Sequence, residues 1–170
     1  MEGDVSSYRR LRVSGGWYFF TVVTHRRTPV FAKECDIAQL RHALRKVMAH
    51  RPFMLDAMVV LPDHLHCIWK LPDGDADFPS RWREIKKAVT RTRVERVRVW
   101  QPRYWEHLIR DEEDWRRHVD YIHFNPVKHG LADDPAAWPW SSFGRFRSRG
   151  LYEAGWGRSC PDNIRGMDLE

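Results

Sequence analysis

His64-Leu65-His66 is the first stretch of the chain whose residue types and spacing could do chemistry. Side chains alternate along a strand, so the two imidazoles would share one face of a sheet while Leu65 points into the core. Two imidazoles side by side can bind one metal ion. Two half-exposed histidines on an ordinary strand would give the same pattern, and that alternative stays open.

Tyr121 and Asn125 form a second candidate pair, because residues four apart lie on one face of a helix. Tyr121 offers a phenol as nucleophile, and Asn125 offers a carbonyl oxygen as metal ligand. The alternative is that Tyr121 packs beneath the helix and Asn125 ends it ahead of Pro126. Of the five tyrosines, only Tyr121 has a potential metal ligand one helical turn away; its rivals are Tyr8, Tyr18, Tyr104 and Tyr152.

The two pairs make chemical sense as one site. A phenol of pKa about 10 is a poor nucleophile at neutral pH, so phosphodiester cleavage by a tyrosine needs a cation on the scissile phosphate. A metal held by His64, His66 and Asn125 would leave positions open for phosphate oxygens. Oxygen and nitrogen ligands without thiolate suit Mg²⁺ or Mn²⁺ as the cofactor, although imidazole also accepts zinc, cobalt or nickel.

The segment 81–103 carries nine basic residues against Glu84 and Glu95. Basic residues beside aromatic ones are typical of surfaces that neutralise DNA phosphates and stack unpaired bases. We expect this helix to bind phosphate while its tryptophans lie in the core; a solvated helix is the alternative. The residues expected to contact DNA are Arg81, Arg83, Lys86, Lys87, Arg91 and Arg93.

Other basic groups could extend that surface or could simply be solubilising charge. They are Tyr8, Arg9, Arg10 and Arg12 near the start and Arg145, Arg147 and Arg149 near the end. A further set could touch phosphate or tune the tyrosine, with packing or a surface position as the alternative: His107, His118, His123, Lys128 and His129.

The elements that position these residues follow from hydrophobic periodicity and turn signals. We predict strands at 17–24, 53–61, 64–71 and 104–109, and helices at 36–48, 81–99 and 111–124. Asp36 and Asp111 are the expected helix caps, Pro62-Asp63 the hairpin turn, and Asn125-Pro126 the end of the last helix. The order β-α-β-β-α-β plus one helix predicts an α+β, ferredoxin-like fold: a four-stranded antiparallel sheet with two helices packed on one face.

Length and composition limit what the chain can be. With 170 residues, of which 42% are hydrophobic, we expect one domain: a core over residues 1–131 and a C-terminal extension over 132–170 packed on or near it. A formal charge of +6 favours an anionic partner such as nucleic acid. No apolar stretch has the length of a signal peptide or a membrane span, which predicts a cytoplasmic protein. Without a CxxC pair, we expect reduced thiols at Cys35, Cys67 and Cys160.

Four stretches resemble the REP-associated tyrosine transposases, a branch of the HUH single-strand transposase superfamily. They are GGWYFFTVVTHRR, VVLPDHLHCIWKLP, YWEHLIRDEEDW and HVDYIHFNPVKHGL. The resemblance runs from about Tyr8 to about Trp156, and the second and fourth motifs are long enough to be specific.

The resemblance implies that His64 and His66 are metal ligands, that Tyr121 is the catalytic tyrosine, and that Asn125 stands at the third-ligand position, whose identity varies across the superfamily. It also implies a divalent metal, the ferredoxin-like fold, and single-stranded DNA with hairpins, the repeated extragenic palindromes, as substrate. A monomer is the expected assembly, with a dimer as the alternative.

The implied reaction is attack of Tyr121 on the phosphate, which joins the enzyme to the 5′ phosphate and frees a 3′ hydroxyl that can later reverse the step. Two other functions stay open. One is a nicking protein of the replication-initiator or relaxase kind, and the other is a non-catalytic hairpin-binding protein with a regulatory or architectural role.

Overall fold

The computed structural model describes residues 12–93 and 98–170 of the chain. Its elements are β1 (Trp17–Val23), α1 (Glu34–His50), β2 (Met54–Val60), β3 (His64–Lys70), α2 (Phe78–Arg91), β4 (Trp105–Leu108), α3 (Glu112–Lys128) and α4 (Phe143–Ser148). Short 3-10 turns lie at His25–Arg27, Pro135–Ala137 and Asp162–Ile164. Within these two ranges, no helix has the length and apolar character needed to cross a membrane.

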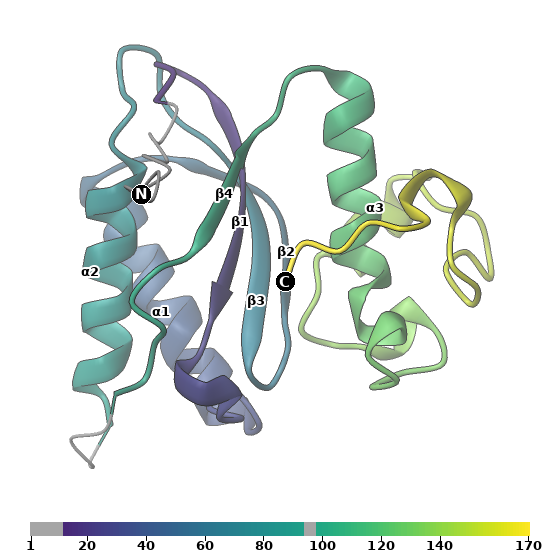
Figure 1. Ribbon diagram of the computed structural model, residues 1–170, viewed down its shortest axis with the longest axis horizontal. Coiled ribbons are helices and arrows are strands. Elements are labelled where there is room, and N and C mark those ends of the chain that lie inside the picture. Colours follow the sequence, from purple (N-terminus) through teal and green to yellow (C-terminus); the bar gives the residue numbers. More distant parts are fainter. Residues whose placement is uncertain (1–11, 94–97) are drawn as a thin grey trace, which may run out of the picture.

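The four strands form one antiparallel sheet in the order β2-β3-β1-β4. This order confirms the ferredoxin-like α+β fold that the sequence predicts. The helices α1 and α2 cover one face of the sheet, and α3 lies on the other (Figure 1). The β2-β3 hairpin turns at Pro62-Asp63, as expected.

Each face of the sheet has its own hydrophobic core. On β3, Leu65 and Trp69 belong to the core beneath α1 and α2, whereas Ile68 belongs to the core beneath α3. Since side chains alternate along a strand, His64 and His66 share the face of Ile68. The two histidines therefore face α3, the helix that carries Tyr121.

The caps of the helices are only partly as predicted. The Asp111 carboxylate accepts a hydrogen bond from the Asp114 backbone N–H at 2.8 Å, which confirms it as the N-cap of α3. Asp36 does not cap α1: it lies inside the first turn, and its carboxylate accepts from Arg93 Nη1 at 2.7 Å. The Arg93 guanidinium gives that carboxylate a charged partner, so it is satisfied without a capping hydrogen bond.

The helix α2 ends at Arg91, earlier than the predicted 81–99, and residues 94–97 lie outside the described part of the chain. The helix α3 runs past Asn125-Pro126 to Lys128, so the prediction that this pair ends it is wrong. Proline removes one hydrogen-bond donor, but the chain then closes the helix with the His129 N–H bonded to the Asn125 carbonyl at 3.1 Å. Gly130 turns the chain away with φ +66°, as predicted.

The residues after Leu131 return to the core. The Val60 N–H donates to the Trp140 carbonyl at 2.8 Å, so the outer edge of β2 is covered. Phe143 and Tyr152 are buried in the core beneath α3. The chain then passes between α3 and the sheet, where its end lies (Figure 1), and the Leu169 carbonyl accepts from Thr21 Oγ1 at 2.6 Å.

Candidate active site

His64 and His66 lie next to each other on one face of β3 and are buried, at 1% and 0% exposed. Each Nδ1 has a partner: Asp63 Oδ1 at 2.6 Å for His64, and Thr21 Oγ1 at 2.8 Å for His66. The single hydroxyl hydrogen of Thr21 is donated to the Leu169 carbonyl, so Thr21 Oγ1 accepts from His66 Nδ1. Both rings therefore carry their hydrogen on Nδ1 and leave Nε2 with a free lone pair.

Neither Nε2 atom has a hydrogen-bond partner among the described residues. Burial lowers the pKa of both imidazoles, and that of His66 falls well below its ordinary value. A neutral imidazole held through Nδ1 is the usual state of a histidine metal ligand. The two side chains thus have the tautomers and the unpaired nitrogen atoms that a divalent metal would use.

Asn125 is completely buried on α3, and both polar atoms of its amide lack a partner within the described part of the chain. It lies midway between Tyr121 and His129, one helical turn from each. The Tyr121 ring packs against His66 at 5.3 Å between centroids, and the His129 ring packs against His64 at 4.9 Å. Asn125 therefore faces the histidine pair, and its oxygen is a possible third ligand.

The Tyr121 side chain is buried, at 1% exposed, but its hydroxyl lies in a polar cluster. Lys128 Nζ donates to it at 2.9 Å, the Leu169 N–H donates at 3.3 Å, and the hydroxyl itself donates to Glu170 Oε1 at 3.2 Å. Burial raises the pKa of Tyr121, and the hydrogen bond from Lys128 opposes that rise. Lys128 is thus the residue placed to favour the ionised phenol.

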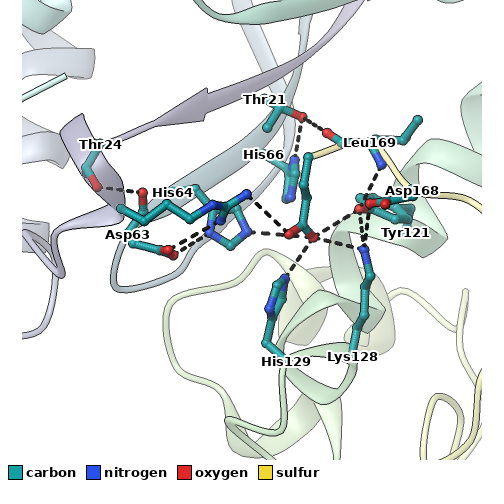
Figure 2. A network of polar contacts seen from close by, with 12 residues as sticks. Thr21, Thr24, Asp63, His64, His66, Tyr121, Lys128, His129, Asp168 and Leu169 are labelled. Carbon is teal, nitrogen blue, oxygen red and sulfur yellow. Dashed lines mark hydrogen bonds and ion pairs between the residues drawn. The ribbon is translucent and has the colours of Figure 1, made fainter. Parts of the chain in front are cut away.

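Figure 2 shows Tyr121, Lys128 and His129 gathered opposite His64 and His66. The Glu170 carboxylate lies among them, since its Oε1 accepts from the Tyr121 hydroxyl at 3.2 Å. It accepts from Lys128 Nζ at 3.0 Å and from His129 Nε2 at 2.8 Å. Its oxygens also lie 3.9 Å from His64 Nε2 and 3.8 Å from Arg27 Nη2. Burial opposes ionisation, but the donors from His129 and Lys128 hold the pKa of Glu170 well below its ordinary value. The hydrogen-bond donors of Lys128 and His129 thus form a site suited to an anion.

The structure brings Tyr121, His66 and His64 within ring contact, and Asn125 lies one helical turn from Tyr121 on α3. Sequence reasoning missed Thr21, Asp63 and Glu170. Asp63 could have been suspected, because it directly precedes the His-x-His pair; Glu170, which lies 49 residues beyond Tyr121, gives no such signal.

The other residues considered near the site fall into three groups. Lys128 and His129 reach the site, as described. His107 and His118 instead hold Asp114, with His107 Nε2 at 2.8 Å from its carboxylate, which also accepts from Arg110 Nε at 3.0 Å. His123 is buried and bonded to Tyr152 and Ser142, so it has a packing role.

The rival tyrosines are placed less favourably. Tyr18 is fully buried in the core beneath α1 and α2, and Tyr104 packs against that same core. Tyr152 is buried and donates its hydroxyl to a carboxylate of α3 at 2.7 Å. Tyr8 lies outside the described residues.

The basic helix α2 lies across the sheet from Tyr121, so its charges do not line the site. Arg81 cannot contact DNA as expected, since it is 1% exposed and its guanidinium is held by Asp75 at 2.6 Å and by backbone carbonyls. Arg93 is largely engaged by Asp36. Lys86 donates to the Gln101 carbonyl at 3.2 Å.

Three of the six predicted DNA contacts remain exposed: Arg83, Lys87 and Arg91. Their spacing of four sets them on one face of α2. Arg147 and Arg149 near the end of the chain are also exposed, whereas Arg145 donates to the Asp56 carbonyl. Arg9 and Arg10 lie outside the described residues.

A His-x-His pair on a ferredoxin-like sheet, facing a helix that carries a tyrosine, is the arrangement expected of the HUH tyrosine enzymes, a class that holds both transposases and nicking proteins. Comparison with known proteins narrows the class. No family model matches the chain. It is 50% identical over 159 residues to the REP-associated tyrosine transposase of Escherichia coli (strain K12), which covers 93% of this chain and 94% of that protein. A Haemophilus influenzae protein assigned to the same family is 37% identical over 175 residues, or 95% and 99% of the two chains.

A solved structure agrees with these relatives. It shows the REP-associated tyrosine transposase bound to a REP hairpin, and it matches with a TM-score of 0.82 at 48% identity, covering 93% of this chain and 96% of its own. The chain belongs to the REP-associated tyrosine transposases. This confirms the family that the sequence motifs indicate.

Proposed function

We propose that the protein cuts and rejoins single-stranded DNA beside the hairpins of repeated extragenic palindromes, with Tyr121 as the nucleophile. The observation that carries the proposal is a set of buried polar atoms without partners beside Tyr121. They are His66 Nε2, whose ring packs against Tyr121, the neighbouring His64 Nε2, and the Asn125 amide one helical turn from Tyr121. Buried polar atoms are costly without a partner, so a site that gathers several of them is suited to a ligand. The solved relative bound to a REP hairpin supports the choice of DNA.

His64, His66 and Asn125 would hold the metal, for which we propose Mg²⁺ or Mn²⁺. When bound, such an ion polarises a phosphate and offsets the charge that develops on it. The test is a calorimetric titration with MnCl₂. We expect one site that is lost in His64→Ala and retained in His42→Ala, which changes an exposed histidine of α1. Equal binding by both variants would contradict the assignment.

Lys128 and His129 are proposed to bind the scissile phosphate, because they already hold the Glu170 carboxylate with short hydrogen bonds. A phosphate oxygen would accept hydrogen bonds from the same two donors once the end of the C-terminal extension moves away from them. Lys128 also donates to the Tyr121 oxygen, so it can stabilise the phenolate as the proton leaves to solvent.

The proposed step forms a bond between the Tyr121 oxygen and phosphorus and breaks the bond from phosphorus to the 3′ oxygen. That oxygen takes up a proton and leaves as a 3′ hydroxyl, while the 5′ phosphate stays on the enzyme. The number of phosphate ester bonds is unchanged, so a 3′ hydroxyl from another end can reverse the step without ATP.

Hairpin binding is a separate part of the proposal. Arg83, Lys87 and Arg91 form an exposed row on α2, on the face of the molecule away from Tyr121. We propose that this row contacts backbone phosphates of the hairpin while the unpaired strand reaches the site. The protein is proposed to act as a monomer, with a dimer as the alternative.

The decisive experiment uses single-stranded oligonucleotides that span repeat hairpins of the chain's own genome, labelled at the 3′ end, with Mg²⁺ or Mn²⁺. On a denaturing gel we expect the label to migrate with the protein. Tyr121→Phe should abolish this adduct and leave hairpin binding intact, whereas the control Tyr104→Phe should retain it. Binding that persists in EDTA with no adduct from any hairpin would favour the non-catalytic alternative, which the Glu170 side chain in front of Tyr121 makes worth testing.

A further inference from the structure

Trp105 is an exposed aromatic residue at the edge of the sheet. Its side chain is 40% exposed, and it is the one aromatic among the large hydrophobic residues that stand exposed in residues 12–93 and 98–170. The other tryptophans near the basic segment, Trp82 and Trp100, are buried. Trp105 begins β4, the last strand in the order β2-β3-β1-β4, so within residues 12–93 and 98–170 no strand pairs with the outer side of β4.

Trp105 lies in line with the candidate active site. The strand register sets His66 opposite Thr21, and Thr21 opposite Trp105, so the three residues form one row across the sheet. Residues in such a row share a face, and two strand spacings separate the ends of the row by roughly 10 Å. Trp105 therefore stands on the face that carries His66, about one nucleotide's reach from it.

An aromatic surface joins the two ends of this row. The Phe19 ring packs edge-on against Trp105 at 5.8 Å between centroids. The same ring stacks on His66 at 5.5 Å and touches Tyr121 at 6.2 Å. The exposed tryptophan is thus continuous with the rings that line the site.

The orientation of the Trp105 ring is fixed by its neighbours. It lies nearly parallel to the His107 ring, with 7° between the ring planes and 5.9 Å between the centroids. The His107 ring in turn lies nearly parallel to that of His118, with 14° between the planes and 4.6 Å between the centroids. His107 and His118 are themselves held by Asp114. A ring held in this way loses little conformational entropy when a second flat group packs on it.

Positive charge flanks the strand. Arg103 precedes β4 and Arg110 follows it, and both are exposed. A rigid aromatic ring between exposed arginines suits a strand of unpaired nucleotides, whose phosphates and bases need both kinds of contact.

We propose that Trp105 stacks against an unpaired base of the single-stranded DNA next to the scissile phosphate, and so helps set which nucleotide is presented to Tyr121. The inference rests on the proposed function, since it takes that DNA to be the substrate. Its partner is a nucleobase, and not a second copy of the chain added to the free edge of β4.

The test measures DNA binding in the Tyr121→Phe background, which separates binding from cleavage. The probes are a repeat hairpin with an unpaired 5′ flank, the same hairpin without the flank, and flanked hairpins with one abasic nucleotide at successive positions. We expect Trp105→Ala to weaken binding of the flanked probe by roughly tenfold or more, the size expected for one stacked base. Trp105→Phe should retain most of the affinity.

Two further results are required. At one abasic position, binding should be weak already and Trp105→Ala should add no further loss, because the ring and the base act as one pair. The hairpin without a flank should bind both proteins equally. Leu151→Ala, which changes a side chain of the same 40% exposure elsewhere on the surface, is the matched control and should bind like its parent.

The proposal is overturned if Trp105→Ala binds the flanked probe like its parent, or loses the same affinity for the hairpin without a flank. It is also overturned if sedimentation shows that the substitution changes the assembly, which would make the partner a second chain. Thermal melting should show that each variant is folded. Failure of the proposed function would appear separately, as absence of a covalent adduct in the protein with Tyr121 intact.

Discussion

Thr21 and Asp63 decide which nitrogen each histidine of the site can offer. Each fixes the hydrogen of its imidazole on Nδ1, so that the lone pair on Nε2 points away from the partner. Asp63 gains from the arrangement, since the hydrogen bond from His64 holds the pKa of its carboxyl below the ordinary value against the effect of burial. We therefore expect the two residues to control metal affinity without touching the metal.

We predict that Thr21→Val lowers the affinity for Mn²⁺ by about 10- to 100-fold, because valine keeps the shape of threonine but cannot accept from His66. Titration calorimetry measures the change. Thr90→Val, the same substitution on the exposed side of α2, serves as the control and should bind metal normally. An unchanged affinity in Thr21→Val would mean that the hydrogen bond does not fix the tautomer.

Lys128 is the cationic side chain that donates to the hydroxyl of the proposed nucleophile. We predict that Lys128→Gln reduces the single-turnover cleavage rate by about 100-fold or more, the typical loss when one preorganised donor to developing charge is removed. Lys128→Arg should recover part of the rate. Hairpin affinity should change much less than the rate, and an equal loss in both would show that Lys128 only binds DNA.

At the scale of elements, α3 carries most of the site, and its first turn anchors it. Asp111 caps the helix, and Asp114, at 4% exposed, accepts from His107 and from Arg110. Burial alone would raise the pKa of Asp114, but these donors hold it well below its ordinary value. A carboxyl whose pKa is lower in the folded than in the unfolded protein adds stability at pH values above its unfolded pKa of about 3.9. This stability is lost as the pH falls below the unfolded pKa and toward the folded one.

Asp114→Asn should therefore lower the free energy of unfolding by roughly 2 kcal/mol at pH 7, the worth of a hydrogen-bonded charged group. The difference from the parent should shrink as the pH falls from about 5 toward 2, because the parent carboxyl then becomes protonated too. Urea unfolding at several pH values measures it. A difference that stays constant with pH would show that the charge of Asp114 is not what stabilises α3.

The helices and strands also show which features of the fold the sequence predicts and which it does not. Local signals, such as aromatic and β-branched runs, Pro62-Asp63 and the Asp111 cap, correctly predict the strands, the hairpin and the start of α3. Asn125-Pro126 misleads, because tertiary contacts of α3 outweigh the loss of one hydrogen bond. For the site, the spacings bring together His64, His66, Tyr121 and Asn125. They give no sign of Glu170, since a contact made 49 residues away leaves no local pattern.

At the scale of the whole molecule, two charged surfaces lie on opposite sides of the sheet. The exposed row of Arg83, Lys87 and Arg91 on α2 is remote from Tyr121, so its neutralisation should affect binding and leave the chemical step unchanged. We predict that replacing all three by glutamine reduces the slope of log Kd against log salt by about 2 to 3 for hairpin DNA. The cleavage rate at saturating DNA should be unaltered. A slower cleavage step would show that the row contacts DNA close to the scissile phosphate, contrary to its position across the sheet from Tyr121.

The C-terminal extension, residues 132–170, belongs both to the site and to the core. Its last residues lie in the site, whereas its earlier residues form part of the core beneath α3. Phe143, Phe146, Tyr152 and Ile164 are all buried beneath α3, so a truncation after Leu131 should expose that core and unfold the protein.

Removal of residues 168–170 alone should leave the melting temperature within a few degrees and raise cleavage, since the Glu170 carboxylate no longer competes with phosphate for Lys128 and His129. Glu170→Gln should act in the same direction, whereas Glu153→Gln, an exposed glutamate of the same tail, should have no effect. A shortened chain that melts normally yet cleaves no faster would show that DNA displaces the tail without cost.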